Sequence, residues 1–416
     1  MDNRTRLTAL IVLLSCFLFV LSKHANAQDE GYHFIPAPDV WYNDVDGVRF
    51  GVRLLGEMKG SFKDGPHRLN AGIWLGSKRP DLPISYYFSF TEPLPFISSF
   101  GEEGSLQLVS SVRAGYSQHQ LWLNKRWQKG FNERRYQEIS VFVSQEKMIE
   151  SEYRLPFHSW SADWKTLTGL RFQTHVFTPL GELETQFNFL HNINEEAGEY
   201  SVGNIQLRHT APLGKGFELN LRGFGGLMSN NAAPEYKYGL AHRPPIEWLN
   251  NGLSRAKGTI PEHFFEEGFT HITGGMNLRG YANSMAFPFT KAMSFNTEFV
   301  FYNPINALIK NSIIGDFAQL KSYVFHDVGV YSAENAYIFD FPEDINEVSA
   351  DAGIGFQFSI NIPDFLGKDR GFAIRYDMPF WLSDPDGLTA GNVQPGSESP
   401  SFKFRGILGI GAVISL

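Results

Sequence analysis

The sequence has 416 residues, of which 43% are apolar and 15% are aromatic, and its formal net charge is −8. This acidic balance argues against nucleic acid as a partner, because phosphate backbones are bound by basic surfaces. The single cysteine, Cys16, lies within residues 1–27, which are predicted below to be a signal peptide, and would be removed with it. We therefore expect no disulfides, no thiol chemistry and no cysteine-ligated metal in the mature chain.

Residues 1–27 have the pattern of a secretory signal peptide. Arg4 and Arg6 give a positive start, an apolar run follows, and Ala25-Asn26-Ala27 is a small-x-small cleavage site. The apolar run is shorter than the roughly 20 residues that a membrane-spanning helix needs. Lipoprotein processing at Cys16 is the alternative, but apolar sequence continues beyond that residue. Cleavage after Ala27 is therefore the prediction.

The mature chain is predicted to be a short periplasmic N-terminal segment, 28–44, followed by an outer-membrane β-barrel, 45–416. The first segment is turn-rich and far below the roughly 50 residues of the smallest usual domain, so nothing folded is expected before the barrel. Charged or amide residues interrupt every candidate spanning helix after the leader. An exported chain with 40 glycines and many aromatics favours a barrel, whose lipid-facing residues are every second one. A soluble β-sandwich or propeller is the alternative.

Strict alternation of apolar and polar residues recurs along the chain and predicts antiparallel strands. Its apolar positions are Val48, Phe50, Val52 and Leu54; Leu69, Ala71, Ile73 and Leu75; Ile84, Tyr86, Phe88 and Phe90; Leu183, Thr185, Phe187 and Phe189; and Phe217, Leu219 and Leu221. The positions between them carry polar, charged or small residues. One face therefore suits lipid and the other suits water, and charged inner faces repeated this often favour a barrel over a sandwich.

The connections alternate between short and long. Tight turns are predicted at 179–181 and 212–216, a longer polar loop at 193–199, and further long loops at 332–347 and 383–400. In outer-membrane barrels the short turns are periplasmic. This assignment places both ends of the barrel on the periplasmic side and makes the number of strands even.

The predicted number of strands is 16. Fourteen follow from the patterns, and two more are expected in the stretch 230–273, near 236–242 and near 263–273. The last strand is the clearest, with apolar residues on one parity up to the end of the sequence. Many outer-membrane barrels end in such a strand, which carries a signal for the assembly machinery. The residues assigned to this signal are Phe402, Phe404, Gly411, Ile414 and Leu416, with Leu416 in place of the usual aromatic.

Three segments in the last third of the chain resemble a known family. Leu278-Arg279-Gly280-Tyr281, between two strand-like segments, resembles the loop-6 motif of the Omp85 superfamily, the BamA/TamA-like (bacterial surface antigen D15-type) barrels. Asn296-Thr297-Glu298-Phe299 resembles the strand with an acidic partner, and Phe325-His326-Asp327-Val328-Gly329 resembles the aromatic-x-Asp-x-Gly strand. Their order matches the family. The opening stretch 41–48 also looks like the family's first barrel strand, although the resemblance is weak before residue 274.

The resemblance implies that loop 6 folds into the lumen and that Arg279 pairs with Glu298 and Asp327 on the inner wall, next to Phe325 and Gly329. A guanidinium offers five donors in a planar fork, so it can bridge two carboxylates, and lysine could not reproduce this geometry. The flanking Gly280 allows a tight reversal, and Tyr281 could pack against the wall. A solvated loop arginine is the alternative.

The alternation of side chains in the strand that contains Asp327 agrees with this pairing of Arg279. Tyr323, Phe325 and Asp327 share one face, and we expect that face to point into the lumen beneath a packed loop. Val324 and His326 lie on the opposite face.

The function implied by the resemblance is assistance in inserting, assembling or translocating proteins or lipids at the outer membrane of a Gram-negative-type bacterium. The protein would not be an enzyme and would need no cofactor or metal. Its partners would be outer-membrane lipids, and its candidate partners are client outer-membrane proteins or a periplasmic or lipoprotein accessory. Most family members carry periplasmic POTRA domains, and the chain resembles a POTRA-less branch. A passive channel or porin, with steady conductance, and a barrel anchor for a separate partner protein are the alternatives.

Two other groups of residues suggest a metal at first sight. His263, Glu266, Glu267 and His271 lack the His-Glu-x-x-His spacing of helical zinc sites, and we interpret them as surface or lumen residues. The stretch 384–387 lacks the further oxygen ligands of a calcium loop and is interpreted as a turn.

Overall fold

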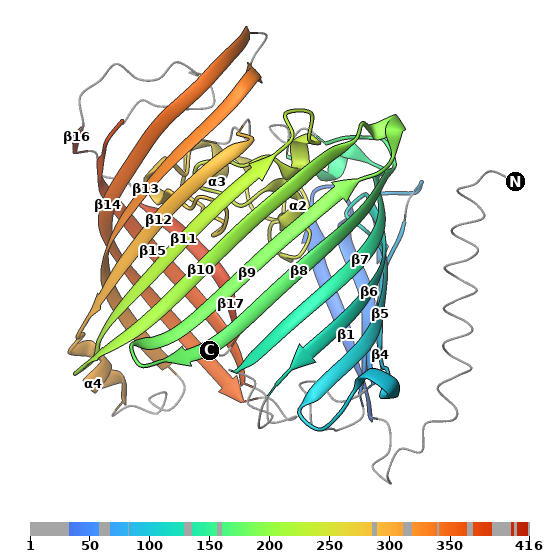
Figure 1. Ribbon diagram of the computed structural model, residues 1–416, viewed down its shortest axis with the longest axis horizontal. Coiled ribbons are helices and arrows are strands. Elements are labelled where there is room, and N and C mark those ends of the chain that lie inside the picture. Colours follow the sequence, from blue (N-terminus) through green and yellow to red (C-terminus); the bar gives the residue numbers. More distant parts are fainter. Residues whose placement is uncertain are drawn as a thin grey trace, which may run out of the picture.

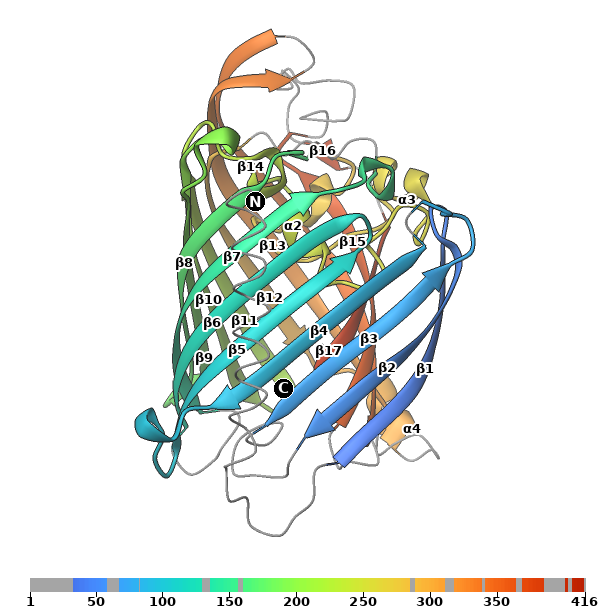
Figure 2. The same cartoon turned by 90° about the vertical axis from the view of Figure 1, so that its right-hand side faces the viewer.

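The structure is a computed structural model, and its strands form one barrel (Figures 1 and 2). It describes residues 33–57, 67–81, 83–128, 135–155, 160–284, 289–310, 318–338, 341–363, 369–384, 401–402 and 406–414.

From β1 to β15, each strand pairs antiparallel with the next along the chain. Both β16 and β17 pair with β15, so they share one wall position and the barrel has 16 strand positions, as the sequence predicts. The strands are β1 (His33–Asn43), β2 (Gly47–Glu57), β3 (Arg68–Gly76), β4 (Ile84–Pro93), β5 (Glu102–Arg113), β6 (Tyr116–Trp127), β7 (Tyr136–Met148), β8 (Lys165–Thr178), β9 (Gly181–Asn192), β10 (Tyr200–Gly214), β11 (Phe217–Met228), β12 (Lys291–Phe301), β13 (Ala318–Ile338), β14 (Phe341–Pro363), β15 (Asp369–Leu382), β16 (Ser401–Phe402) and β17 (Ile407–Ile414).

The helices are short and lie in the connections. They are η2 (Pro95–Ile97), η4 (Ser151–Tyr153), η5 (Glu195–Ala197), η6 (Pro234–Tyr236), α2 (Pro245–Trp248), α3 (Glu262–Glu266), η7 (Arg279–Tyr281) and α4 (Ile305–Lys310). Among the described residues, no helix is long and apolar enough to cross a membrane.

The predicted alternation of side chains is confirmed along the wall. Phe50 is 58% exposed on the outside of β2, whereas its neighbour Arg49 is buried. On β3, Ile73 and Leu75 are exposed and Trp74 is buried between them. A barrel-shaped antiparallel sheet with an apolar exterior is the form in which strands cross a bacterial outer membrane. The chain is therefore a transmembrane β-barrel of the outer membrane.

The barrel begins earlier than the sequence analysis predicts. Strand β1 covers His33–Asn43, inside the segment 28–44 that was placed before the barrel, and it pairs with β2 over its whole length. The prediction that the barrel starts at residue 45 is therefore wrong. Pro36 and Pro38 hide the strand pattern in the sequence, yet proline is tolerated on an edge strand because it has no N–H to donate. The stretch 41–48 is the β1–β2 hairpin turn with its flanks.

Two further predictions about the connections are wrong. The stretch 230–273 contains no strand among its described residues, and α3 lies where the second strand was expected. The loop predicted at 332–347 is a continuation of β13 and β14, whose hairpin projects beyond the barrel rim (Figure 1). The long loop predicted at 383–400 lies almost wholly outside the described residues.

The connection from β11 to β12 is the sixth on its side of the barrel, and we call residues 229–290 loop 6. It contains η6, α2, α3 and η7, and Figures 1 and 2 place α2 and α3 within the ring of strands. Its apolar side chains form a core with inward-facing residues of the wall, including Leu240, Met276 and Leu278 of the loop, none of which is exposed. Burial of this apolar area holds the loop inside the barrel.

Candidate functional site

The tip of loop 6 is a tight turn at the motif singled out in the sequence. Leu278 N–H donates to Leu240 O at 2.9 Å and Tyr281 N–H donates to Leu278 O at 3.1 Å, which closes the short helix η7. Gly280 lies against the inner wall, where an added Cβ would be 2.7 Å from the Asp351 Cβ. Only glycine allows the loop backbone to approach the wall this closely.

Arg279 is bound to Asp327 as the family resemblance implies. Its Nε–H donates to Asp327 Oδ2 at 2.7 Å and its Nη2 donates to Oδ1 at 2.8 Å, a bidentate pair. Its Nη1 donates to Glu298 Oε1 at 2.8 Å. Neither Arg279 nor Asp327 is exposed at all. Loop 6 is thereby attached to strands β12 and β13, and we call this cluster the Arg279 lock.

The lock includes two charged residues of β15 that the sequence analysis missed. Arg279 Nη1 also contacts Asp377 Oδ1 at 3.4 Å, and Arg375 Nε–H donates to Asp377 Oδ2 at 2.7 Å. Arg375 pairs with Glu298 as well. Two guanidinium groups therefore face three carboxylates. The available signal was Arg375 and Asp377 at alternate positions of a membrane strand, where charge points to the lumen.

Aromatic and small residues complete the lock. The Arg279 guanidinium carbon lies 3.9 Å from the centre of the Phe325 ring, a cation–π contact. Tyr323 O–H donates to Asp377 Oδ1 at 2.8 Å. A Cβ on Gly329 would lie 2.6 Å from Met276 Cε of loop 6. Tyr281 O–H donates to Ala350 O at 3.2 Å. The wall beneath the loop is therefore shaped to its side chains.

Burial alone would lower the pKa of Arg279, but the carboxylates of Asp327, Glu298 and Asp377 together outweigh this effect and raise the pKa well above its ordinary value. The arginine is therefore charged at every physiological pH, and the lock does not open by deprotonation of Arg279.

Loop 6 has a second buried ion pair near its start. Lys165 at the beginning of β8 pairs with Glu235 of η6, and neither residue is exposed. Ser161 N–H donates to the other Glu235 oxygen, Oε2, at 3.1 Å. Next to it, Tyr236 O–H donates to Glu146 Oε1 of β7. The sequence gives no signal for this pairing, because Lys165 and Glu235 are 70 residues apart.

Two buried histidines hold the middle of loop 6 together. His242 Nε2 bonds to Ala282 O at 2.9 Å, and Ile272 N–H donates to His242 Nδ1 at 3.3 Å. His271 Nε2 bonds to Ala241 O at 2.8 Å. Burial lowers the pKa of His242 to about 4 and the pKa of His271 well below its ordinary value. Both rings are therefore neutral, and His242 Nδ1 must stay unprotonated to accept its hydrogen bond.

We expect acidification to loosen loop 6. Between pH 6.5 and about 4 a released His242 takes up a proton that the seated ring does not, so stability is full above pH 6.5 and is lost as the pH falls. Melting temperatures at pH 7.5, 5.5 and 4.5 should fall in that order, and the His242→Gln/His271→Gln double variant should show a flatter profile. An equal fall in the double variant would contradict this assignment.

The other predicted residues are placed as follows. Phe402 pairs with Trp381 of β15, Gly411 with Ala373 and Ile414 with Arg370. Phe404 and Leu416 lie outside the described residues. His263 and Glu266 are on α3 and Glu267 follows it, while His271 is buried inside loop 6.

Comparison with known proteins does not decide a family. No family model matches the chain, and no curated protein matches its sequence. Similar solved structures include BamA from Haemophilus ducreyi lacking POTRA domains 1–3, with a TM-score of 0.44 at 11% identity over 92% of this chain and 69% of that chain. The outer membrane protein OprD from Pseudomonas aeruginosa has a TM-score of 0.33 at 10% identity over 92% of each chain. A bacterial polysaccharide outer membrane secretin has a TM-score of 0.34 at 8% identity, over 84% of this chain and 90% of that chain.

Proposed function

We propose that this protein is an Omp85-type outer-membrane barrel that assists the insertion, assembly or translocation of proteins or lipids and catalyses no chemical reaction. The observation that carries the proposal is the Arg279 lock. A buried arginine on a loop tip, bound to carboxylates of the wall strands β12, β13 and β15, keeps a long loop inside the lumen. Such a brace suits a barrel whose wall is strained or opened while the protein functions, because it fixes part of the wall to loop 6.

The seam between the first and last strands is the place where such a wall would open. Within the described residues, ladder pairings run through consecutive strands from β1 to β15 and join β16 and β17 to β15, and none joins β17 to β1. A strand edge without a partner exposes N–H and C=O groups that can pair with another chain. An incoming strand could therefore be templated there by β-augmentation.

Loop 6 contacts both sides of this seam. Leu408 N–H of β17 donates to Phe269 O at 2.7 Å, and Thr270 forms a parallel bridge with Leu408. On the other side, Asp44 N–H in the β1–β2 turn donates to Lys257 O at 3.2 Å. The same loop therefore carries the lock and touches both β17 and the β1–β2 turn. Releasing the lock would change how the seam is covered.

The outer surface beside the seam is apolar. A hollow of about 390 Å³ is lined by Val40, Trp41, Tyr42 and Val48 of the β1–β2 hairpin and by Thr259 of loop 6. Exposed aromatic and aliphatic side chains at a strand edge suit a lipid tail or the apolar face of an incoming strand.

The test is the folding rate of an unrelated outer-membrane barrel into lipid vesicles, with and without the purified protein. We expect acceleration that Arg279→Ala loses and that Arg135→Ala, a change at an exposed arginine outside the lock, retains. No acceleration by well-folded protein would sink the proposal and leave the channel and anchor functions. A steady wild-type conductance in planar bilayers would then favour the channel, and co-purification of one stoichiometric partner would favour the anchor.

A second variant separates the seam from the lock. Thr270→Cys/Leu408→Cys places two cysteines at the bridge between loop 6 and β17, in a mature chain that is expected to have no other. If the seam must open, oxidation should abolish the acceleration and reductant should restore it. Unchanged acceleration after complete cross-linking would rule out opening at this edge.

A further inference from the structure

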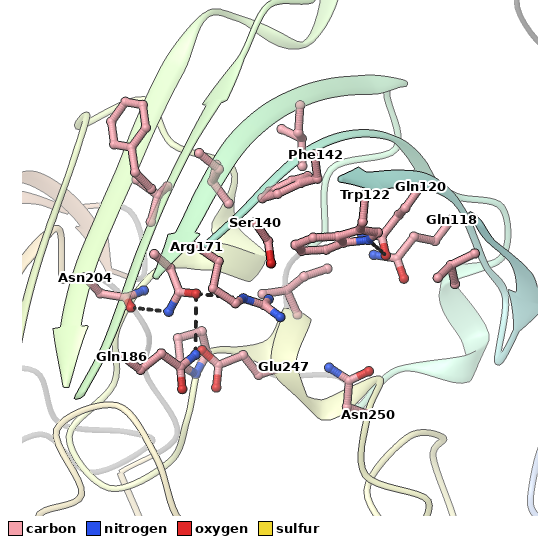
Figure 3. A pocket seen from close by; sticks show the side chains of 18 of the residues that line it. Gln118, Gln120, Trp122, Ser140, Phe142, Arg171, Gln186, Asn204, Glu247 and Asn250 are labelled. Carbon is pink, nitrogen blue, oxygen red and sulfur yellow. Dashed lines mark hydrogen bonds between the residues drawn. The ribbon is translucent and has the colours of Figure 1, made fainter. Parts of the chain in front are cut away.

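We infer that the lumen cavity beside loop 6 binds an anionic glycan, a saccharide chain that bears carboxylate or phosphate groups. The cavity has a volume of about 720 Å³ and is lined by strands of the β3–β11 wall and by loop 6 (Figure 3). The inference is independent of the assembly function, because it depends on a different part of the lumen from the Arg279 lock.

The cavity is elongated and lies between one side of the barrel wall and loop 6. Its lining extends from Arg68, the first residue of β3, to Glu146 near the opposite end of β7. Glu247 of α2, Asn250 and Gly274 close it on the loop side. A cavity that follows the wall over this distance suits a chain-like ligand better than a compact one.

Amide side chains form a large part of the cavity lining. They include Gln118 and Gln120 from β6, Gln186 and Asn188 from β9, and Asn204 and Gln206 from the adjacent strand β10. Each amide presents both a donor and an acceptor, which is the pattern that sugar hydroxyl groups require. Binding pockets for apolar small molecules are lined mainly by hydrophobic side chains. This composition therefore favours a polyhydroxylated ligand.

Arg171 provides an anion-binding group at the centre of these amides. Its guanidinium carbon lies 4.7 Å from the centre of the Trp122 ring, which stacks on Phe142 at 4.3 Å. Its Nε–H donates to Asn188 Oδ1 at 3.0 Å, and Asn188 Nδ2 donates to Asn204 Oδ1 at 2.9 Å. Figure 3 shows the side chain pointing into the cavity. The guanidinium is therefore held in place before any ligand binds.

The terminal nitrogens of Arg171 remain available. Among the described residues, no carboxylate lies within ion-pair distance of Arg171, and Nη1 and Nη2 make no hydrogen bond to protein. A fixed planar fork with two free N–H edges matches a carboxylate or phosphate bidentately. The ligand that fits both features is therefore polyhydroxylated and also bears an anionic group.

The other charged residues that line the cavity do not cancel its preference for an anionic ligand. Glu103 is paired with Arg68 at 2.6 Å and Glu138 with Arg126 at 3.3 Å. Arg243 also lines the cavity and makes its bond to a carbonyl, Thr273 O, at 2.7 Å. Glu146 accepts from Gln118 at 3.1 Å and from Tyr236. Glu146 and Glu247 are the lining carboxylates that oppose an anion, and Glu247 faces Arg171 across the cavity (Figure 3).

The test uses the full-length protein in lipid nanodiscs and isothermal titration with three probes: a hexamer of galacturonic acid, maltohexaose and inorganic phosphate. We expect the acidic hexamer to bind about tenfold or more tightly than the neutral one, and more weakly as salt rises. Arg171→Gln should remove that advantage. Arg135→Gln, a change at an exposed arginine outside the cavity, should leave it unchanged.

Two further variants address folding and geometry. Arg171→Lys keeps the charge and loses the fork, so it should fold and bind with intermediate affinity. Asn188→Ala releases Nε without changing charge and should also weaken binding. Equal affinity for the acidic and neutral hexamers, no binding of either hexamer, or phosphate binding as tight as the acidic hexamer would each overturn the inference.

Discussion

Arg279→Ala should release loop 6 from the wall of the barrel. The substitution leaves Asp327, which is fully buried, without its cation and beside Glu298 and Asp377 of the same sign. Removing one partner of a buried ion pair costs about 3–5 kcal/mol, because the remaining charge is desolvated and uncompensated. We therefore expect a large fall in melting temperature, measured from the heat-dependent shift in gel mobility, while the strands still form.

Two variants make this prediction specific. Arg279→Lys keeps the charge but loses the bidentate pair, so its melting temperature should lie between those of the wild type and the alanine variant. Arg135→Ala removes an exposed arginine and should change nothing. A melting temperature of Arg279→Ala equal to that of the wild type would show that the lock does not hold the loop.

Lys165→Met should produce the second large effect, at the other end of loop 6. The substitution leaves Glu235 as a buried carboxylate without its cation, and neither residue is exposed to water. The same reasoning gives a cost of about 3–5 kcal/mol, although water or protonation of Glu235 would recover part of it. Limited proteolysis should then cut the chain between Glu235 and Lys257, where the wild type resists.

The double variant Lys165→Met/Glu235→Leu separates charge from packing. Replacing both members of a buried ion pair by apolar side chains is often neutral or stabilising, because no charge remains to be desolvated. We expect the double variant to regain most of the protease resistance that Lys165→Met loses. Failure to recover would show that shape, and not the unpaired carboxylate, determines the loss.

Sequence pattern was sufficient for most of the wall, and the family resemblance implied the centre of the lock. Alternation of side chains has a period of two, so residues such as Phe50 and Arg49 reveal both the strand and its two faces. Arg279, Glu298 and Asp327 were accessible because they stand in recognisable short motifs, and the structure brings all three together. Local alternation was enough for these strands, whereas the pairing of the lock residues was implied by the family resemblance.

The remaining part of the site depends on contacts that local pattern does not encode. Arg375 and Asp377 meet Arg279 only because β15 lies two strands from β13 in the barrel wall. Loop 6 was misread as two strands because its apolar residues, such as Leu240 and Phe265, pack inside a barrel and need no period of two. Strand β1 was missed because prolines interrupt its pattern. Each of these features is determined by tertiary packing.

The Arg279 lock, the two buried histidines and the Lys165–Glu235 ion pair together hold loop 6 in the lumen. Loop 6 is fixed near its start by Glu235, in its middle by His242 and at its tip by Arg279. Between these anchors, Lys257 and Phe269 touch the two sides of the seam. Loosening any of these three anchors should therefore weaken the contacts between loop 6 and the seam. Low pH should act through the middle anchor, His242.

Hydrogen exchange measured by mass spectrometry on the peptide 274–284 tests the lock most directly. These residues belong to a 62-residue connection by the bounds 229–290, yet the amides of Arg279, Tyr281 and Ala282 are hydrogen-bonded and buried. The lock predicts slow exchange in the wild type and a large increase in Arg279→Ala, with no change in Arg135→Ala. Fast exchange of this peptide in the wild type would contradict a seated loop 6.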